Sequence, residues 1–195
     1  MRIFISLVLA FFFFALVARA DIVVSGSSSL RNLGYSLEPL VGYEQVYRST
    51  PTSHTKTRSF RGLRLIVGSD KLAGEGEYTK GEDTENFSVT PQSITNKDDV
   101  FMVGARTTWL LRGNLFVGLR GGGLAARNIN EMTTNGNRTS TESSPQYSPY
   151  VGVQLGWRFA KNFGVSISSV IIMKDLGDLA KNNYQNSIAF SVGTN

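Results

Sequence analysis

The stretch Ser148-Pro-Tyr-Val-Gly-Val-Gln-Leu-Gly-Trp-Arg-Phe-Ala160 alternates between two kinds of side chain along its whole length. The odd-numbered residues from Pro149 to Phe159 are apolar, whereas the even-numbered residues are mostly small, polar or charged. Successive side chains of a β-strand point to opposite faces, so this stretch is predicted to be a strand with one apolar face. A second alternating run, 163–174, follows after only Lys161 and Asn162, which predicts a β-hairpin.

The same alternation recurs along the chain and predicts eight strands. Their approximate ranges are 36–48, 59–68, 72–80, 99–111, 115–126, 148–160, 163–174 and 184–194, of which 72–80 has the thinnest apolar face. The connections after the second, fourth and sixth strands are short, and those after the first, third, fifth and seventh are long, polar loops: 49–58, 81–98, 127–147 and 175–183. Tight turns should therefore gather at one end of the sheet and solvated loops at the other.

The chain begins with the pattern of an export signal. Arg2 precedes an apolar run from Ile3 to Val17, and the small residues of Ala18-Arg19-Ala20 follow. We expect residues 1–20 to be a signal peptide that is cleaved after Ala20, because the apolar run is shorter than the roughly 20 residues of a membrane-spanning helix. The serine-rich segment 21–34 is interpreted as a periplasmic lead-in, and 35–195 as the folded domain.

Composition excludes several kinds of site. The 195 residues include no cysteine and one histidine, so thiolate and multi-histidine metal sites are ruled out, and we predict no cofactor. The formal net charge is +5, which does not indicate nucleic-acid binding by an exported protein.

Two features favour apolar side chains that point outward into lipid. The expected strands of 9 to 13 residues match those of outer-membrane barrels, whereas strands of soluble proteins are mostly about 5–6 residues long. Such a sheet must close on itself, because lipid offers no partner to a free backbone N–H or C=O. The sequence thus predicts an all-β, eight-stranded antiparallel up-and-down transmembrane β-barrel; a secreted soluble β-sandwich is the alternative.

Aromatic residues are predicted to form two girdles at the membrane interfaces. Those beside the short turns are Trp109, Trp157, Phe159 and Phe163, and those near the long loops are Tyr43, Tyr47, Tyr78, Phe101, Tyr147 and Tyr184.

The opposite face of the strands carries charges of both signs. These expected lumen residues are Glu38, Glu44, Arg64, Glu75, Glu77, Arg106, Arg120 and Arg158. The interior of an eight-stranded barrel is just wide enough for side chains to fill, and buried charges are normally paired. We therefore predict a charge-paired, plugged lumen; a small gated channel is the alternative.

One further alternative is enzymatic. Ser53 and His54 in the first long loop, with Asp83 or Glu85 in the next, could imitate an acyl-transfer triad. Their spacing is unspecific, so we predict no enzymatic activity and keep a lipid A-modifying enzyme as the less favoured hypothesis.

The hairpin Tyr150-Val-Gly-Val-Gln-Leu-Gly-Trp-Arg-Phe-Ala-Lys-Asn-Phe-Gly-Val-Ser-Ile167 resembles the penultimate hairpin of small Gram-negative outer-membrane barrels similar to the OmpA membrane domain and OmpX. The resemblance lies in the strand pattern over 35–195 and not in a diagnostic motif. It implies the outer membrane of a Gram-negative bacterium, contact with outer-membrane lipid and lipopolysaccharide, insertion by the barrel-assembly machinery, and a structural or surface-interaction role in which the loops meet an extracellular ligand. The chain departs from the pattern at its end, Phe190-Ser-Val-Gly-Thr-Asn195, where such barrels often carry a terminal aromatic residue.

Overall fold

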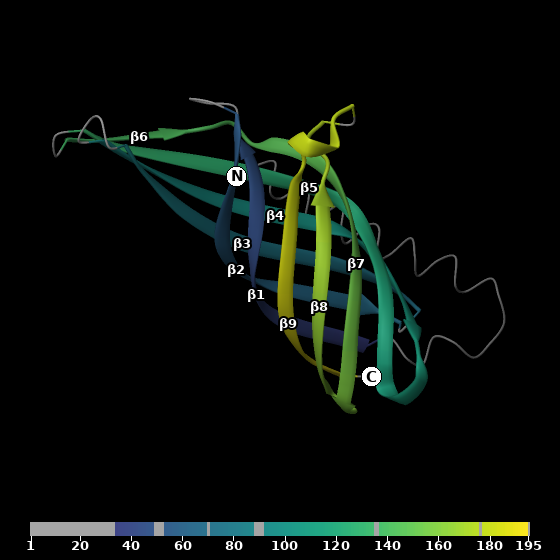
Figure 1. Ribbon diagram of the computed structural model, residues 1–195. Coiled ribbons are helices and arrows are strands. Elements are labelled where there is room, and N and C mark those ends of the chain that lie inside the picture. Colours follow the sequence, from purple (N-terminus) through teal and green to yellow (C-terminus); the bar gives the residue numbers. More distant parts are fainter. Residues whose placement is uncertain are drawn as a thin grey trace.

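Eight antiparallel strands close into a barrel in the computed structural model, which describes residues 34–48, 53–69, 71–87, 92–134, 137–175 and 177–194 (Figure 1). The predicted signal peptide and almost all of the predicted lead-in lie outside these residues. The barrel strands are β1 (Gly34–Arg48), β2 (His54–Gly68), β3 (Leu72–Phe87), β4 (Gln92–Leu110), β5 (Leu115–Thr134), β7 (Gln146–Ala160), β8 (Phe163–Ile172) and β9 (Asn183–Thr194).

Each strand pairs with its neighbour in the chain, and β1 pairs with β9 to close the ring. The predicted fold class, an eight-stranded antiparallel up-and-down barrel, is confirmed. Within the described ranges, the helical segments are two short 3-10 turns, η2 (Arg112–Asn114) and η3 (Leu179–Lys181), and no helix is long and apolar enough to cross a membrane.

The two faces of the sheet are sorted as the alternation predicts. On β1, Leu37 is 43% exposed on the outside, whereas the next residue, Glu38, is 1% exposed on the inside. Trp109 and Trp157, at 48% and 49% exposed, also lie outside the barrel. The interior thus receives the buried charged side chains, and the exterior carries most of the large apolar ones.

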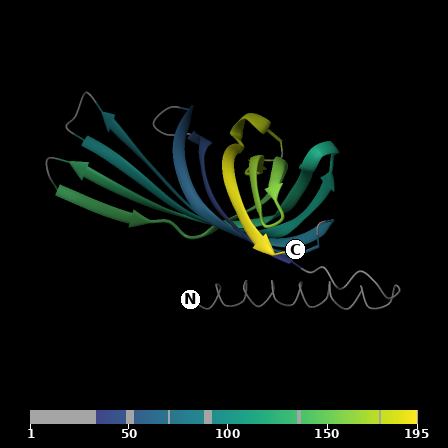
Figure 2. The same ribbon diagram turned by 90° about the horizontal axis from the view of Figure 1, so that it is seen from below.

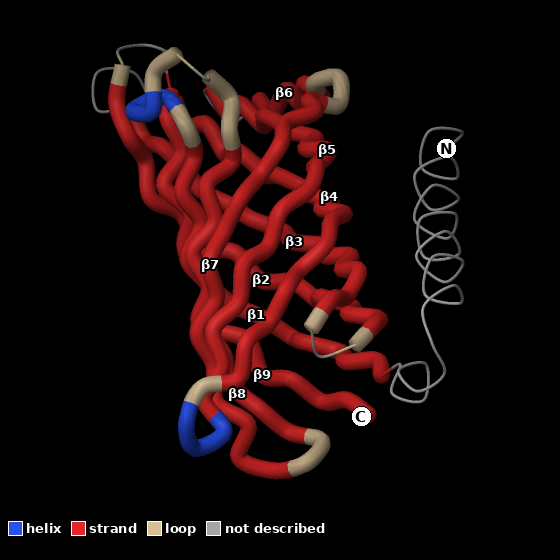
Figure 3. The backbone as a smooth tube through the Cα atoms, turned by 90° about the vertical axis from the view of Figure 1, so that its right-hand side faces the viewer, coloured by secondary structure: helices blue, strands red, loops and turns tan. Residues whose placement is uncertain are grey.

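The two ends of the barrel differ (Figure 3). Ser69 and Lys71 and the short connections 111–114 and 161–162 lie at one end, together with Tyr35 and Thr194, which pair across the β1–β9 seam. We call this the short-turn end. Arg48 and His54, which pair where β1 ends and β2 begins, and the segments 173–175 and 177–182 lie at the other end, which we call the outer end.

The predicted loops 81–98 and 127–147 are wrong, because most of these residues are strand. β3 continues to Phe87 and β4 begins at Gln92, while β5 continues to Thr134 and turns into a ninth strand, β6 (Asn137–Glu142). Pairing of β2 with β3 stops at Glu82, and that of β5 with β7 stops at Ala126. Beyond these points the β3–β4 and β5–β6 hairpins form a four-stranded sheet outside the ring, which we call the extension (Figure 2).

The strands of the extension could not be predicted from the sequence, for a physical reason. Apolar alternation marks a strand only where its two faces meet different surroundings, and both faces of this sheet are mostly polar. Backbone hydrogen bonds between antiparallel neighbours continue regardless of the side chains. For the same reason β2 begins at His54 and not at residue 59, and the third strand, expected to be the weakest, is 16 residues long.

Glycines in the wall make room for a large residue in the interior. A Cβ on Gly104 would lie 2.4 Å from the Tyr150 hydroxyl oxygen and 2.3 Å from the backbone oxygen of Gly121. Tyr150 is buried there together with Met102, Leu124 and Val170. Gly104 is therefore needed for the approach of β5 and for the position of Tyr150.

Replacing Gly104 by alanine should destabilise the barrel by about 1–3 kcal/mol, the usual range for overpacking a filled interior. The measurement is the urea concentration at which half of the refolded barrel is unfolded, monitored by tryptophan fluorescence. Gly76→Ala is the matched control, since a Cβ there meets no atom within 4 Å. Equal unfolding midpoints for the two variants would contradict the packing described here.

Candidate functional site

A row of three charged side chains crosses β1, β2 and β3 inside the barrel. Arg64 lies directly opposite Glu38 on one neighbouring strand and opposite Glu77 on the other. Its Nη1 is 2.8 Å from Glu38 Oε2, and its Nε is 2.7 Å from Glu77 Oε2. Arg64 is completely buried, and these two carboxylates accept hydrogen bonds from its Nε and Nη1.

The row continues to the far wall through Arg120 of β5. Its Nη2 lies 2.7 Å from Glu77 Oε2, and its Nε lies 2.8 Å from Glu75 Oε1. The hydroxyl of Tyr150 donates a hydrogen bond of 2.7 Å to the same Glu75 oxygen. The ion pairs thus run across the interior from β1 to β5, which lie four strands apart in the ring of eight.

Arg106 completes the set with longer contacts. It faces Arg120 directly across the β4–β5 pair, and its Nη1 lies 3.5 Å from Glu38 Oε1 and 3.3 Å from Gln154 Oε1. Opposed like charges are unfavourable, and the glutamates of β1 and β3 offset this repulsion. We call the three glutamates and three arginines the lumen network: Glu38, Glu75, Glu77, Arg64, Arg106 and Arg120.

A second charged cluster lies nearer the outer end. Arg58 Nη2 is 2.6 Å from Glu44 Oε2, and Arg58 also forms an ion pair with Asp98. Asn183 of β9 donates a hydrogen bond of 2.8 Å to Glu44 Oε1. Glu44 and Arg58 are almost fully buried, so this cluster too crosses the interior.

Apolar side chains separate the two charged clusters. On β1, Leu40 lies between Glu38 and Glu44, and on β2, Phe60 lies between Arg64 and Arg58; both pack with Ala189. On β4, buried Val100 and Met102 lie between Arg106 and Asp98, and they pack with Leu124 and Tyr150. Along the axis the interior is therefore layered as charged, apolar and charged.

The structure divides the eight predicted lumen residues among three places. Six form the lumen network, and Glu44 lies apart from them with Arg58. Arg158 lies at the short-turn end, where its guanidinium carbon is 5.6 Å from the centroid of the Phe116 ring. Arg58 and Asp98 were predicted to lie in loops, because the apolar alternation stops short of both, although each has the inward parity of its strand.

At the outer end, His54 of the hypothetical triad lies near one candidate acid, but cations surround both acids. His54 Nε2 is 3.7 Å from Glu85 Oε1, but the same oxygen lies 3.6 Å from Arg48 Nε and 3.7 Å from Lys56 Nζ. Asp83 binds Arg48 at 2.8 Å. Both candidate acids are thus held by cations.

The predicted girdle residues lie on the outer surface near the two ends. At the short-turn end the ring centroids of Trp157 and Phe159 are 5.9 Å apart, and Phe159 also contacts Phe163 and Phe190. Trp109 is exposed at the same end. The residues toward the outer end, fully or partly exposed, are Tyr43, Tyr47, Tyr78, Phe101, Tyr147 and Tyr184.

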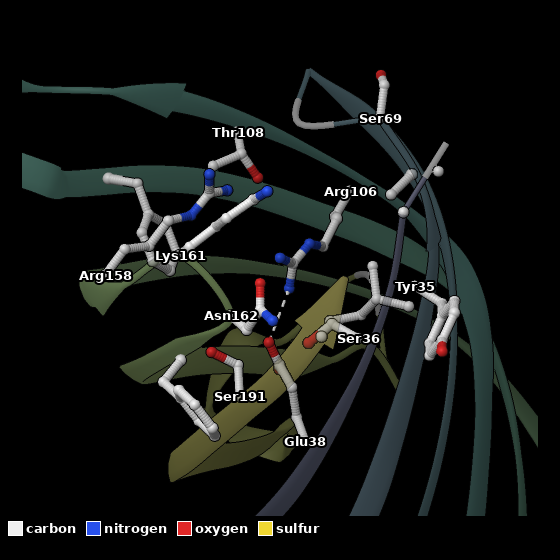
Figure 4. A pocket seen from close by; sticks show the side chains of 17 residues that line it. Tyr35, Ser36, Glu38, Ser69, Arg106, Thr108, Arg158, Lys161, Asn162 and Ser191 are labelled. Carbon is white, nitrogen blue, oxygen red and sulfur yellow. Dashed lines mark hydrogen bonds and ion pairs between the residues drawn. The ribbon is translucent and has the colours of Figure 1, made fainter. Parts of the chain in front are cut away.

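No group of three or more histidine or acidic side chains in the described part of the chain is arranged to hold a metal ion. A pocket of about 70 Å³ lies at the short-turn end (Figure 4). Its lining residues include Glu38, Arg106, Arg158 and Lys161.

No protein-family model matches the chain, and no curated protein matches its sequence. Solved structures match its fold. The crystal structure of Ail, the attachment invasion locus protein of Yersinia pestis, in complex with the heparin analogue sucrose octasulfate, is 13% identical with a TM-score of 0.55, and the match covers 83% of this chain and 98% of that one. The outer membrane protein OprG from Pseudomonas aeruginosa is 7% identical with a TM-score of 0.50, over 83% of this chain and 96% of that one. The chain thus has the fold of the small outer-membrane β-barrels.

Replacing Arg64 by methionine should lower the free energy of unfolding by about 3–5 kcal/mol, because it leaves two buried glutamates without their partner. Lys97→Met is the control: its exposed ion pair with Glu131 should contribute at most about 1 kcal/mol. The double variant Arg64→Met/Glu38→Met should recover part of the loss. An Arg64→Met barrel that unfolds in urea at the wild-type midpoint would show that the ion pairs of Arg64 with Glu38 and Glu77 do not stabilise the barrel.

Proposed function

We propose that this protein is a non-enzymatic barrel of the Gram-negative outer membrane, with a plugged lumen and a structural or surface-interaction role. In this placement the short-turn end faces the periplasm and the outer end faces the exterior. Export by a cleaved signal peptide and insertion by the barrel-assembly machinery belong to the same proposal.

The outer surface supports placement in lipid. Soluble monomers rarely expose a continuous apolar surface of this extent, and a closed sheet leaves no unpaired edge in the bilayer. The aliphatic residues exposed on the outside of the barrel include Leu37, Val41, Leu63, Leu65, Val67, Leu115, Leu119, Val151, Val153, Leu155, Ile167 and Ile188.

The observation that carries the proposal is the layered interior. Arg64 bridges Glu38 and Glu77, and Arg120 bridges Glu77 and Glu75, so the ion pairs run from wall to wall. Leu40, Phe60 and Met102 pack on the outer side of these pairs. An ion that crossed this interior would have to break several buried ion pairs and pass an apolar layer, which favours a plug over the small gated channel.

The extension supports a surface-interaction role. Its charges pair with one another: Lys97 Nζ is 2.9 Å from Glu131 Oε2, and Arg138 pairs with the same carboxylate. All residues of β6 are exposed, and β6 pairs with β5 alone, so its second edge offers backbone N–H and C=O groups. We propose that an extracellular partner binds here through hydrogen bonds to the edge and to the Thr, Ser and Asn side chains.

The lipid A-modifying enzyme is less well supported. A triad requires an acid that orients its histidine, and Glu85 is shared among His54, Arg48 and Lys56.

Cations on the outer surface suggest a contact with lipopolysaccharide. Arg61 lies directly opposite Lys80, Lys80 opposite Asp99, and Asp99 opposite Arg127, so four neighbouring strands share one row. Like charges that face each other across strands are unfavourable, and Asp99, 3.6 Å from Lys80, offsets only part of this repulsion. We propose that a lipid A phosphate lies between Arg61 and Lys80, next to the Tyr78 ring at the edge of the apolar band.

In a planar bilayer the protein should give no steady open-pore conductance, because the layered interior blocks the axis. On gels the unheated protein should migrate differently from the heated one, as a barrel that resists detergent does. Persistent ion-selective conductance that Arg64→Ala changes would contradict the plug and favour a channel. Recovery of the protein in the soluble periplasmic fraction would contradict the membrane placement.

The double variant Arg61→Gln/Lys80→Gln should lose most of the thermal stabilisation that added lipopolysaccharide gives to the barrel in maltoside micelles. Dephosphorylated lipopolysaccharide should stabilise the wild-type barrel no better than it does the variant. Lys97→Gln, whose lysine already has a carboxylate partner, is the control. Equal stabilisation of the wild type and the double variant would rule out this contact.

A further inference from the structure

The pocket at the short-turn end lies beside the lumen network, with which it shares Glu38 and Arg106. Its lining comes from the ends of several strands, from β1 to β9, and from the 161–162 turn. Lining residues such as Thr108 and Phe116 have the inward parity of their strands and are buried. We call this pocket the inner vestibule.

Three cationic side chains converge in the inner vestibule. Figure 4 shows the nitrogen ends of Arg106, Arg158 and Lys161 pointing toward a common centre, although the residues belong to β4, β7 and the turn after β7. Glu38 is the one acid among the described lining residues. Its Oε2 binds Arg64 at 2.8 Å and its Oε1 lies 3.5 Å from Arg106. The described lining thus brings three cations together with one carboxylate that also belongs to the lumen network.

Neighbouring side chains hold these cations in place. The Arg158 guanidinium lies over the Phe116 ring at 5.6 Å, and Arg106 Nη1 lies 3.3 Å from Gln154 Oε1. The turn that carries Lys161 is tied to β9 by a hydrogen bond of 3.0 Å from Gly193 N to the Asn162 carbonyl oxygen. A site whose donors are already positioned loses less entropy when it binds a ligand.

Neutral hydrogen-bonding groups complete the lining. The hydroxyl of Thr108, the side-chain amide of Asn162 and the hydroxyl of Ser191 lie around the same centre in Figure 4. A volume of about 70 Å³ is on the scale of one small polyatomic ion or one anionic group of a larger ligand.

We infer that the inner vestibule binds a phosphate group, with Arg106, Arg158 and Lys161 as its charged ligands. A tetrahedral dianion has several acceptor oxygens, and arginine guanidinium groups suit phosphate because they donate two parallel hydrogen bonds. The group can belong to inorganic phosphate, to a small phosphate monoester or to a phospholipid headgroup that reaches around the short turns. The inference concerns this end of the barrel whichever compartment it faces, so it does not depend on the proposed function.

The test is calorimetric titration of inorganic phosphate into the folded barrel in maltoside micelles, which contain no phosphate. We expect saturable binding of one phosphate per chain, about tenfold or more weaker in Arg158→Gln and in Lys161→Gln, since each substitution removes a charged hydrogen-bond donor. Lys181→Gln is the matched control, because this lysine lies at the outer end beside Asp178. Heat-modifiable migration of each variant verifies that it is folded.

Two arms identify the source of the phosphate group. If phosphatidylglycerol added to the micelles competes with inorganic phosphate, and Lys161→Gln abolishes this competition, the headgroup shares the site. If inorganic phosphate binds and the lipid does not compete, the ligand is a soluble phosphate. The inference is overturned if neither binds, or if Arg158→Gln and Lys161→Gln bind phosphate as the wild type and Lys181→Gln do.

Discussion

Pairing between buried glutamates and arginines is the constraint on which the rest of this structure depends. Arg64 is 0% exposed and has a carboxylate from each neighbouring strand within hydrogen-bonding distance. A shift of the β1–β2 or β2–β3 register by one residue would turn these charges to the outside and bring leucines to the inside. The ion pairs and the outward aliphatic residues therefore specify the same register, since each kind of side chain is costly on the opposite face.

The charges are not evenly distributed along the axis. Three glutamates and three arginines balance within the lumen network, and toward the outer end Arg58 is matched by Glu44 and Asp98. At the short-turn end, Arg158 and Lys161 join Arg106 around a pocket whose described lining contains one acid. This asymmetry distinguishes the two ends chemically: the outer end offers paired charges and a free strand edge, and the short-turn end offers converging cations.

The extension follows a different rule from the barrel. The ring needs an apolar outside and a polar inside, whereas the hairpins beyond Glu82 and Ala126 have no such division and depend on backbone pairing and on surface ion pairs such as Lys97–Glu131. Surface pairs of this kind contribute little stability. The extension is therefore the part of the molecule whose sequence is least constrained by folding, and the part best suited to vary with a partner.

The sequence by itself determined the strands of the barrel, their inward and outward faces and the positions of the tight turns. The reason is that the alternation of faces appears in neighbouring residues, such as the outward Leu37 and the inward Glu38. It also identified the six residues of the lumen network as inward charges. It could not assign Arg58 and Asp98, because they lie beyond the apolar alternation, nor the strands of the extension, which lack it. Only the tertiary structure decided that Arg120 forms ion pairs with Glu75 and Glu77, and that Arg158 lines the inner vestibule together with Lys161. Closure of the ring sets the distances between residues on non-adjacent strands, and no local pattern records them.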